Sequence, residues 1–494
     1  MLVVISDLHL IGATIGNHNV PPEWFRHFLC DWVPTLAKER KAQELKVLLM
    51  GDIVDLIRTE QWLGIDLSSR PWGGNGRRDI KRAIHNRPIG ESRTEEQCLR
   101  ILGDPRDLKK DTILYQNQQT FNLFRSDSEE CFIHKIKQVM GDSFKVEVIY
   151  LPGNHDRLCN LYPSLRDWLR EQLNLTVEKH TVEGEPKGDW WYPYQFKDEA
   201  YGVFARHGHE YDPWNYGNPR DLPHVSGDYP RVEQLQVPIG DVIATEFAVK
   251  VPKLLREREF PYKQEVIENI EQMDNVRPAS SVFEFFLSDV RNRTDETVRN
   301  ELENMFDQVL NELIDILGQQ WQYPGTLGGI MARVFSAPQL KWFRTNPRLM
   351  PYADRLFERL LPYLGMVQER FTDPTKDAHT RAAYNERIWK QDNRIRYILY
   401  GHTHNPLIHP LELRNNGGTI GEAESVYINT GTWRNRIFRA VAFDPSLEES
   451  PYFVPLEQIT YVVFYSEDED PYKEPGTTSF DMWTGSTMKS YMGG

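Results

Sequence analysis

Residues 2–9 read LVVISDLH, so that a short apolar run is followed at once by Asp7 and His9. A continuous run of Val, Ile and Leu of this length is typical of a strand that is buried on both faces. Residues two apart on a strand share a face, so Asp7 and His9 are expected to point the same way. The stretch predicts a buried strand that carries a polar site at its carboxyl end.

The same pattern recurs along the chain. Five further apolar runs end in Asp, Asn, His or Gly: 47–50 before Gly51-Asp52, 146–151 before Gly153-Asn154-His155-Asp156, 202–205 before His207-Gly208-His209, 397–400 before Gly401-His402-Thr403-His404, and 426–428 before Asn429. Open α/β folds place their sites along the carboxyl edge of the sheet. The repetition therefore predicts an α/β protein whose polar clusters meet at one edge.

Composition narrows the class of protein. The 494 residues include 58 Lys and Arg against 72 Asp and Glu, a net charge of -14, which disfavours non-specific nucleic-acid binding. The four cysteines are scattered, which favours reduced thiols over a disulfide scaffold or a zinc knuckle. Neither a membrane span nor a signal peptide can be read from the sequence, so we expect a cytoplasmic protein.

Two long segments interrupt the strand pattern. Residues 58–143 begin with a loop rich in Gly and Arg and contain a helix predicted over 117–140. Residues 213–394 are predicted to be mostly helical, and the clearest helix starts at Thr294 as N-cap and stops at Gly318. We therefore predict a core of residues 1–57, 144–212 and 395–465 that carries two insertions. The last segment, 466–494, is rich in Gly, Ser, Thr and acidic residues and is predicted to be a mobile tail.

The polar clusters together offer oxygen and imidazole ligands for metal ions. The candidate ligands are Asp7, His9, Asp52, Asn154, His207, His402 and His404. This set suits Mn²⁺, Fe²⁺ or Zn²⁺, and Asp52 can bridge two cations. Two such ions about 3.5–4 Å apart would clamp a phosphoryl group and turn a bridging water into the nucleophilic hydroxide. His209 is an alternative to His207, because both lie in one His-Gly-His sequence.

The polar clusters, in the order in which they follow the predicted strands, resemble the sequence motifs of the calcineurin-like metallophosphoesterase superfamily. The matching residues are Asp7-Leu8-His9, Gly51-Asp52-Ile53-Val54-Asp55, Gly153-Asn154-His155-Asp156, His207 and Gly401-His402-Thr403-His404. The sequence around Asp7 and Asp52 is most similar to that of the UDP-2,3-diacylglucosamine pyrophosphatase-like branch. Members of this branch are much shorter. The resemblance implies a four-layer α/β/β/α sandwich, here with a large α-helical insertion.

The resemblance also implies a role for each ligand. It gives the first metal Asp7, His9 and His404. It gives the second metal Asn154, His207 and His402. Asp52 would bridge the two ions, and His155 would either protonate the leaving oxygen or only hydrogen-bond the phosphate. Asp55 and Asp156 would orient imidazoles or tighten turns. Mn²⁺ is the expected metal.

The signals for the substrate leave alternatives open. Arg77 and Arg78, in a basic run over 70–87, would bind a phosphate or a nucleic-acid backbone, or start a solvated helix. Tyr211 and Trp214 follow His207 closely and would stack on a base or sugar, or pack against the insertion. An apolar stripe over 242–255 would line an acyl-chain groove or a membrane contact, or form helix core.

These observations predict a metal-dependent hydrolase of phosphoester or pyrophosphate bonds. A small or restricted phosphorylated substrate is expected, such as a nucleotide or a nucleotide conjugate. The alternative enzyme is a nuclease that acts on DNA or RNA, which the basic run would support. The alternative from another class is a non-catalytic scaffold that binds a protein partner, for instance through the helical insertion. That every ligand position is filled favours an enzyme.

Overall fold

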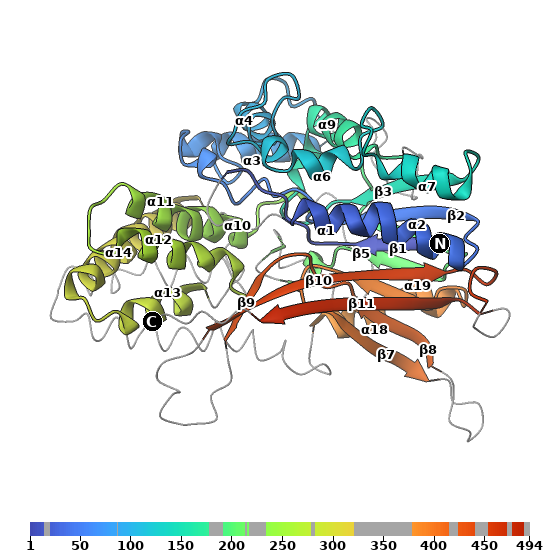
Figure 1. Ribbon diagram of the computed structural model, residues 1–494. Coiled ribbons are helices and arrows are strands. Elements are labelled where there is room, and N and C mark those ends of the chain that lie inside the picture. The colour runs from blue at the N-terminus through green and yellow to red at the C-terminus, as the bar shows by residue number, and fades with distance from the viewer. Residues whose placement is uncertain are drawn as a thin grey trace, which may run out of the picture.

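The computed structural model describes residues 1–13, 20–85, 87–176, 191–212, 215–216, 234–277, 282–320, 378–413, 423–439, 453–471 and 477–488. These residues form an α/β structure with two mixed sheets and many helices, shown in Figure 1. The α/β class predicted from the apolar runs is confirmed.

The first sheet has the strand order β11-β10-β1-β2-β3, with β9 paired to β10. Its strands are β1 (Leu2–Ile5), β2 (Glu44–Met50), β3 (Lys145–Leu151), β9 (Arg436–Arg439), β10 (Phe453–Tyr465) and β11 (Ser479–Met488). The strands β1, β2 and β3 are parallel, and β10 runs antiparallel to β1. The carboxyl ends of the three parallel strands therefore lie at one edge.

The second sheet has the order β4-β5-β6-β8-β7. Its strands are β4 (Gln195–Asp198), β5 (Val203–Arg206), β6 (Tyr397–Tyr400), β7 (Leu407–Leu413) and β8 (Ala423–Asn429). The central strands β5, β6 and β8 are parallel, whereas the outer two are antiparallel to their neighbours. All six runs predicted as strands are present, and they are the parallel strands of the two sheets.

Alternation along β1 shows why its apolar run is unbroken. Leu2 and Val4 pack in a cluster that joins the two sheets and includes Val203 and Leu399. Val3 belongs to the larger cluster on the opposite face, which the helices cover. Because successive side chains point to opposite faces, a strand between two apolar layers must be apolar at every position.

Helices cover the outer faces of both sheets. Over the first sheet and in the first insertion they are α1 (Pro22–Arg26), η1 (His27–Trp32), α2 (Val33–Glu39), α3 (Gly74–Ile84), α4 (Arg93–Leu102), α5 (Ile113–Gln116), α6 (Gln118–Asn122), α7 (Phe132–Met140), α8 (Leu158–Leu161) and α9 (Pro163–Leu173). Against the second sheet lie α18 (Ala378–Asn385) and α19 (Arg387–Gln391). Trp389 of α19 packs with Phe204 and Ile398 of that sheet.

The second insertion is helical where it is described, as expected. Up to residue 320 its helices are α10 (Ile239–Ile243), η6 (Ala244–Val249), α11 (Lys250–Arg256), α12 (Lys263–Glu271), η7 (Gln272–Asn275), α13 (Val282–Asn292) and α14 (Glu296–Gln320), whereas α18 and α19, which also fall within residues 213–394, pack on the second sheet. The helices up to α14 gather at one end of the two sheets (Figure 1). Phe247 and Phe286 are fully buried there, and both rings pack on Phe306. The apolar stripe over 242–255 is thus mostly buried helix core.

Details of three predicted segments need correction. The N-cap of α14 is Asp295, whose carboxylate accepts the N–H groups of Thr297 and Val298. The helix also continues past Gly318, because one glycine costs a long helix only about 1 kcal/mol. The helix predicted over 117–140 is two helices, α6 and α7, separated by polar turns at residues 125–131.

The expected mobile tail is also wrong over Ser479–Met488. These residues form β11, which pairs with β10 from Tyr465↔Ser479 to Leu456↔Met488. Phe480 and Met482 pack against the cluster between the sheets. The core therefore extends beyond residue 465. None of the helices in the described part of the chain is long and apolar enough to cross a membrane.

Candidate metal centre

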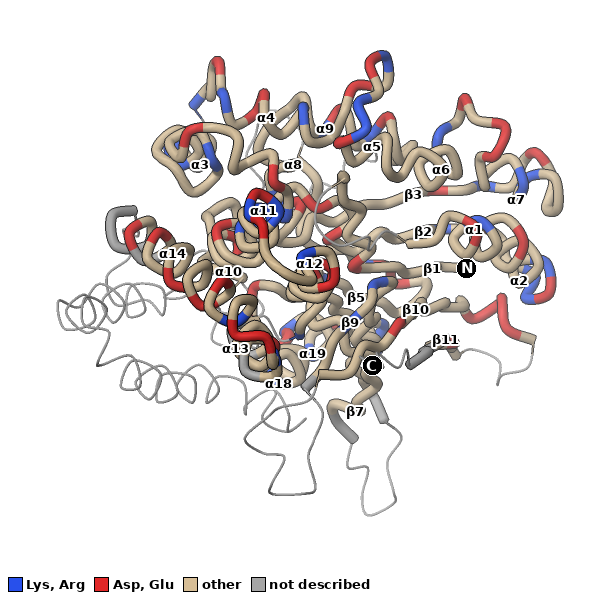
Figure 2. Tube along the Cα trace, turned by 60° about the vertical axis from the view of Figure 1, so that its left-hand side comes forward, with Lys and Arg blue, Asp and Glu red and all other residues tan. Residues whose placement is uncertain are grey.

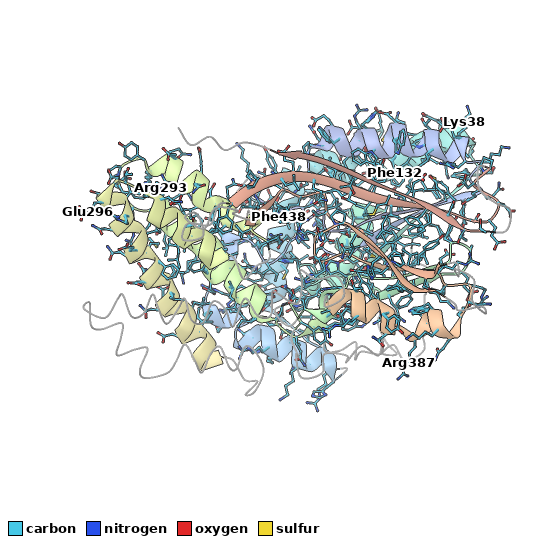
Figure 3. All side chains as sticks on the ribbon, turned by 90° about the horizontal axis from the view of Figure 1, so that it is seen from below. Lys38, Phe132, Arg293, Glu296, Arg387 and Phe438 are labelled. Carbon is cyan, nitrogen blue, oxygen red and sulfur yellow. The ribbon has the colours of Figure 1, made fainter. Side chains whose placement is uncertain are left out.

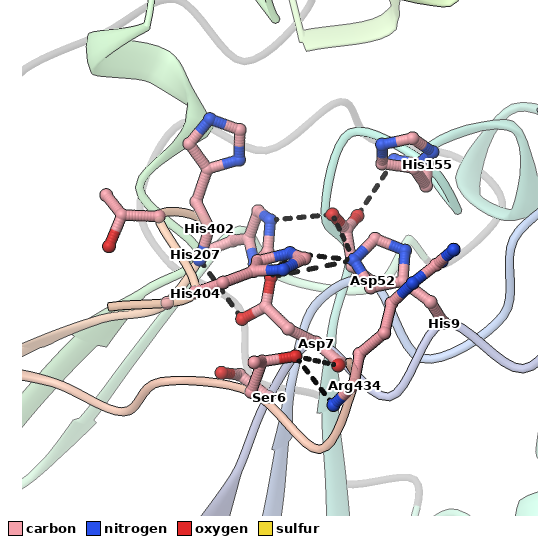
Figure 4. A network of polar contacts seen from close by, with 12 residues as sticks. Ser6, Asp7, His9, Asp52, His155, His207, His402, His404 and Arg434 are labelled. Atoms are coloured by element: carbon pink, nitrogen blue, oxygen red, sulfur yellow. Dashed lines mark hydrogen bonds and ion pairs between the residues drawn. The ribbon is translucent and has the colours of Figure 1, made fainter. Parts of the chain in front are cut away.

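The loops after the parallel strands meet and hold one another by backbone hydrogen bonds. The N–H of Asp7 donates to the carbonyl of Gly51 at 3.0 Å, and the N–H of His9 donates to that of Asp52 at 2.8 Å. The N–H of Gly401 donates to the carbonyl of His207 at 2.9 Å. The polar clusters predicted to converge are therefore brought together, as Figure 4 shows.

Five of the predicted ligands have a strained backbone. Positive φ angles occur at Asp7 (53°), His9 (46°), Asp52 (53°), His402 (66°) and His404 (59°). Residues with a side chain seldom adopt this left-handed conformation, and where it persists it is concentrated at functional sites. The strain turns each side chain out of the strand direction at the point where the strand ends.

Three glycines make room for ligands from neighbouring loops. A Cβ atom at Gly51 would overlap the imidazole of His207, and one at Gly153 would overlap the carboxylate of Asp52. A Cβ atom at Gly401 would likewise overlap the carboxylate of Asp7. The glycine that opens each Gly-Asp, Gly-Asn and Gly-His sequence is thus required by close approach of another ligand.

Backbone donors fix the two aspartates and leave one oxygen of each for another partner. The N–H of His402 donates to Oδ2 of Asp7 at 3.1 Å, while Asp7 Oδ1 is buried without a hydrogen bond. The N–H of His155 donates to Oδ1 of Asp52 at 2.8 Å. Oδ2 of Asp52 then faces His9 and His207, whose Nε2 atoms lie 3.7 and 3.2 Å away.

The first group of ligands consists of Asp7, His9 and His404. Their ligand atoms lie within 4.8 Å of one another. Nε2 of His404 is 3.3 Å from Oδ1 of Asp7 and 3.0 Å from Nε2 of His9. Nδ1 of His9 lies 3.1 Å from the carboxylate of Asp55, which orients the ring from behind.

The second group consists of Asp52, His207 and His402, again within 4.8 Å. Nδ1 of His207 donates to the carbonyl of Met50 at 3.0 Å, so its Nε2 is directed at Asp52. Asn154 follows Gly153, which closely approaches the carboxylate of Asp52, and the buried Oδ1 of Asn154 accepts no hydrogen bond. Nε2 of His402 lies 3.0 Å from Oδ2 of Asp212.

His155 lies between the two groups and is partly exposed, at 14%. Together with His9 and Asp52 it forms a third set of closely spaced ligand atoms. Nδ1 of His155 is 3.1 Å from Oδ1 of Asp55, and its ring meets that of His9 edge-on. Asp55 thus holds two imidazoles at once, which is the orienting role expected for it.

The buried carboxylates attract positive charge. Burial raises the pKa of Asp7 to about 7, and the charge of Asp52 adds to this effect. Burial also opposes ionisation of Asp52, but His207 and His155 hold its pKa well below the ordinary value. For His207, burial acts to lower the pKa, yet Asp52 and Asp7 raise it to about 10. A cation between these side chains would be strongly stabilised.

The residues fit a pair of divalent cations. Asp7 and Asn154 each have a buried oxygen without a hydrogen bond. Nε2 of His207 faces a carboxylate oxygen of Asp52, so that, with Nε2 unprotonated, two lone pairs would oppose each other unless both bound a cation. Such orphaned acceptors are costly unless something binds them. Carboxylate, amide and imidazole donors suit Mn²⁺, Fe²⁺ and Zn²⁺ alike.

His209, the alternative ligand, lies close to the centre but outside its ligand groups. Its ring is 5.4 Å from that of His207 and 6.3 Å from that of His402, between ring centroids. Burial lowers the pKa of His209 to about 4. Within the described residues it is His207 that joins Asp52 and His402. Asn429, the last residue of β8, donates to the carbonyl of Gly401 at 2.8 Å.

The residues predicted to contact the substrate are not brought together. Arg77 and Arg78 lie on α3, which packs against η3 (Leu67–Ser69) and α4, and Figure 2 shows basic residues on this helix. Arg78 is half-exposed and pairs with Asp79 at 3.4 Å. Tyr211 is buried, and its hydroxyl donates to Glu386 at 3.0 Å. Tyr211 is thus packed against the second sheet and hydrogen-bonded there, and Trp214 lies outside the described residues.

Several residues around the centre were not predicted. Asp212 contacts His402, and Nη2 of Arg58 lies 2.6 Å from Nδ1 of His9. Arg58 and Arg434 both contact the carboxylate of Asp274. Asp212 stands only five residues after His207, which is a usable signal. Asp274 lies far from the predicted ligands in the sequence and belongs to no motif.

Comparison with known proteins found no match for this chain. The chain matches no family model, no curated protein and no solved structure. What the site does is therefore inferred from its own residues and their geometry.

Proposed function

We propose that the chain is a dinuclear metal-dependent hydrolase of phosphoester or pyrophosphate bonds, akin to the calcineurin-like metallophosphoesterases. The observation that carries this proposal is the position of Asp52. Its Oδ2 atom lies between His9, at 3.7 Å, and His207, at 3.2 Å, which belong to different ligand groups. A carboxylate shared in this way suits a bridge between two cations.

The fold supports the same proposal. Two mixed sheets share one apolar layer, and helices pack on the outer face of each sheet. We interpret this arrangement as the four-layer α/β/β/α sandwich of that superfamily. The ligands lie at the carboxyl ends of β1, β2, β3, β5 and β6, where open α/β folds carry their sites.

The metal ions would be held by residues from both sheets. Asp7, His9 and His404 would hold the first ion. Asn154, His207 and His402 would hold the second, with Asp52 between them. Manganese is the metal we propose. When bound, such a pair supplies Lewis acidity toward a phosphoryl oxygen and lowers the pKa of water.

The protein's own side chains would position the substrate and its protons. Because Asp55 engages Nδ1 of His155, the other ring nitrogen is left for a substrate oxygen. His155 is the only partly exposed member of its ligand set, so it can reach a leaving oxygen and give it a proton. Asp156 tightens the same loop, since it accepts the N–H groups of Ile53 and Gly153.

The second insertion favours a small or restricted substrate. Its helices lie at the end of the sheets where the ligands gather (Figure 1). Asp274 and Thr245 of this insertion contact Arg58 and the carbonyl of Ile57, directly after the β2 loop. A wall of this kind leaves less room for duplex nucleic acid than an open sheet edge.

Hydrolysis of bis-p-nitrophenyl phosphate with added Mn²⁺ tests the proposal. Wild type should turn over, whereas Asp52→Asn should lose at least about 100-fold in kcat/KM. Asp107→Asn is the matched control, because Asp107 is 72% exposed in the first insertion. Equal turnover by wild type and Asp52→Asn would contradict the proposal. Cleavage of DNA or RNA that falls steeply with rising salt would instead favour a nuclease.

A further inference from the structure

Four arginines gather beside the first group of metal ligands. They are Arg58, Arg277, Arg434 and Arg436. Three are buried, with exposed fractions of 3%, 1% and 4% for Arg58, Arg434 and Arg436, and Arg277 is half-buried. The four come from three distant parts of the chain: the β2 loop, the second insertion, and the start of β9 with the residues just before it. Arginines are seldom buried without partners of opposite charge.

The backbone joins these parts. Val276 forms a β-bridge with Ile437, and the N–H of Arg277 donates to the carbonyl of Ile437 at 3.0 Å. Arg277 is thereby placed next to Arg436 in space. The insertion thus contributes one arginine to a cluster whose other members belong to the core.

The cluster has more positive than negative charge. Asp274 contacts Arg58 and Arg434, and Asp55 contacts Arg58. The guanidinium of Arg277 donates only to the carbonyls of Asp274 and Val276, at 3.0 and 2.9 Å. That of Arg436 donates to the carbonyl of His404 and to Gln458. In the described part of the chain neither guanidinium forms an ion pair, although the charge of Asp274 acts on Arg277 and that of Asp7 acts on Arg436.

Two donors in the cluster are unused. Nη1 of Arg434 and Nε of Arg436 are buried and donate no hydrogen bond. Burial and the neighbouring guanidinium groups lower the pKa of Arg277 to about 9 and that of Arg434 to about 10. Buried N–H donors without a partner are costly, and an anion that accepted from them would relieve the cost.

The cluster adjoins the first metal position. Arg436 contacts the backbone of His404, and Arg58 contacts the ring of His9. Figure 4 draws Arg434 together with the predicted ligands. An anionic group bound by these arginines would thus lie beside a phosphate held at the metals.

We propose that Arg277, Arg434 and Arg436 form an anion subsite that binds the second phosphate of a substrate with a phosphoanhydride bond. This inference rests on the proposed function and narrows its substrate class to diphosphates, such as nucleoside diphosphate conjugates. Guanidinium groups bind phosphate through paired N–H donors, which suits this role.

The reaction on such a substrate is a simple hydrolysis. The oxygen of water bonds to the phosphorus at the metal centre, and the bond from this phosphorus to the anhydride oxygen breaks. That oxygen leaves on the phosphate that the arginines hold. One proton of the water stays on the first product. His155 would give its proton to the leaving oxygen and take the other proton of the water in return.

Binding of inorganic pyrophosphate to the full chain after treatment with EDTA tests the subsite without catalysis. Calorimetry should detect binding to wild type, and Arg277→Gln should weaken it about 10-fold or more. Arg293→Gln is the matched control, since Arg293 lies at the outer end of the same insertion (Figure 3) and pairs with Glu265 and Asp289. Arg277→Lys, which keeps the charge, should bind with intermediate affinity.

The outcomes separate this inference from the proposed function. No binding to wild type, or equal binding by wild type and Arg277→Gln, would overturn the subsite and leave the arginines as a structural clamp. An equal loss in Arg293→Gln would overturn it as well. A specific loss in Arg277→Gln without any Mn²⁺-dependent hydrolysis would support the subsite and refute the proposed hydrolase. With hydrolysis present, Arg277→Gln should raise KM for a nucleoside diphosphate sugar more than for bis-p-nitrophenyl phosphate.

Discussion

Replacing Asp274 by Asn should loosen the junction between the second insertion and the metal centre. The side chain of Asp274 is 7% exposed, and its two carboxylate oxygens accept from Arg58 and Arg434. Asn keeps the shape but removes the negative charge. Among the described residues, Arg58 would keep its ion pair with Asp55, whereas Arg434 would keep only a neutral hydrogen-bond partner, Asn275.

The size of the effect follows from this geometry. Removing one partner of a buried ion pair costs about 3–5 kcal/mol, because the other charge stays buried. An unfolding entropy of about 2.1 cal/mol/K per residue gives about 1 kcal/mol/K for 494 residues. The melting temperature should therefore fall by about 3–5 °C if the chain unfolds as one unit.

Differential scanning calorimetry of the two proteins measures this shift. Asp107→Asn is again the control, because Asp107 is 72% exposed and the side chain of Lys109, with which it forms an ion pair, is 57% exposed. Such a surface pair contributes little, so this variant should melt with wild type. A melting temperature of Asp274→Asn within about 1 °C of wild type would refute the reasoning.

Two further changes act on the ligands directly. Gly153→Ala should abolish tight Mn²⁺ binding, because the new Cβ atom would overlap the carboxylate of Asp52, and metal analysis after gel filtration measures it. Gly74→Ala, where a Cβ atom meets nothing within 4 Å, should bind metal normally, and equal binding by both variants would contradict the prediction. Asp55→Asn should lower kcat with bis-p-nitrophenyl phosphate about 10- to 100-fold, since Asp55 orients the rings of His9 and His155. An unchanged kcat would show that these contacts do not orient the rings.

The parallel strands could be predicted because their environment is uniform. β1, β2, β3, β5, β6 and β8 lie between two apolar layers, so their sequences are unbroken apolar runs. The strands β4, β7, β9 and β11 lie outside these runs in both sheets. Their sequences mix polar and apolar residues, as in Ser479–Met488, and mixed patterns of this kind resemble loops. The composition of the tail was therefore misleading.

The candidate ligands could be predicted because each follows its strand within a few residues. Asp7 and Asp52 need no knowledge of the fold beyond the rule that parallel strands share a carboxyl edge. Asp274 and the arginines could not be found in this way. Their proximity depends on how the second insertion docks, through Val276 and Ile437, against a strand more than 150 residues away.

The two-cation centre is the central claim, and the number of Mn²⁺ ions bound per chain tests it most directly. Titration calorimetry of EDTA-treated wild type should show two sites. Asp52→Asn should retain at most one, because the shared oxygen between His9 and His207 is lost. Wild type that binds no Mn²⁺, or two sites of unchanged affinity in Asp52→Asn, would contradict the account.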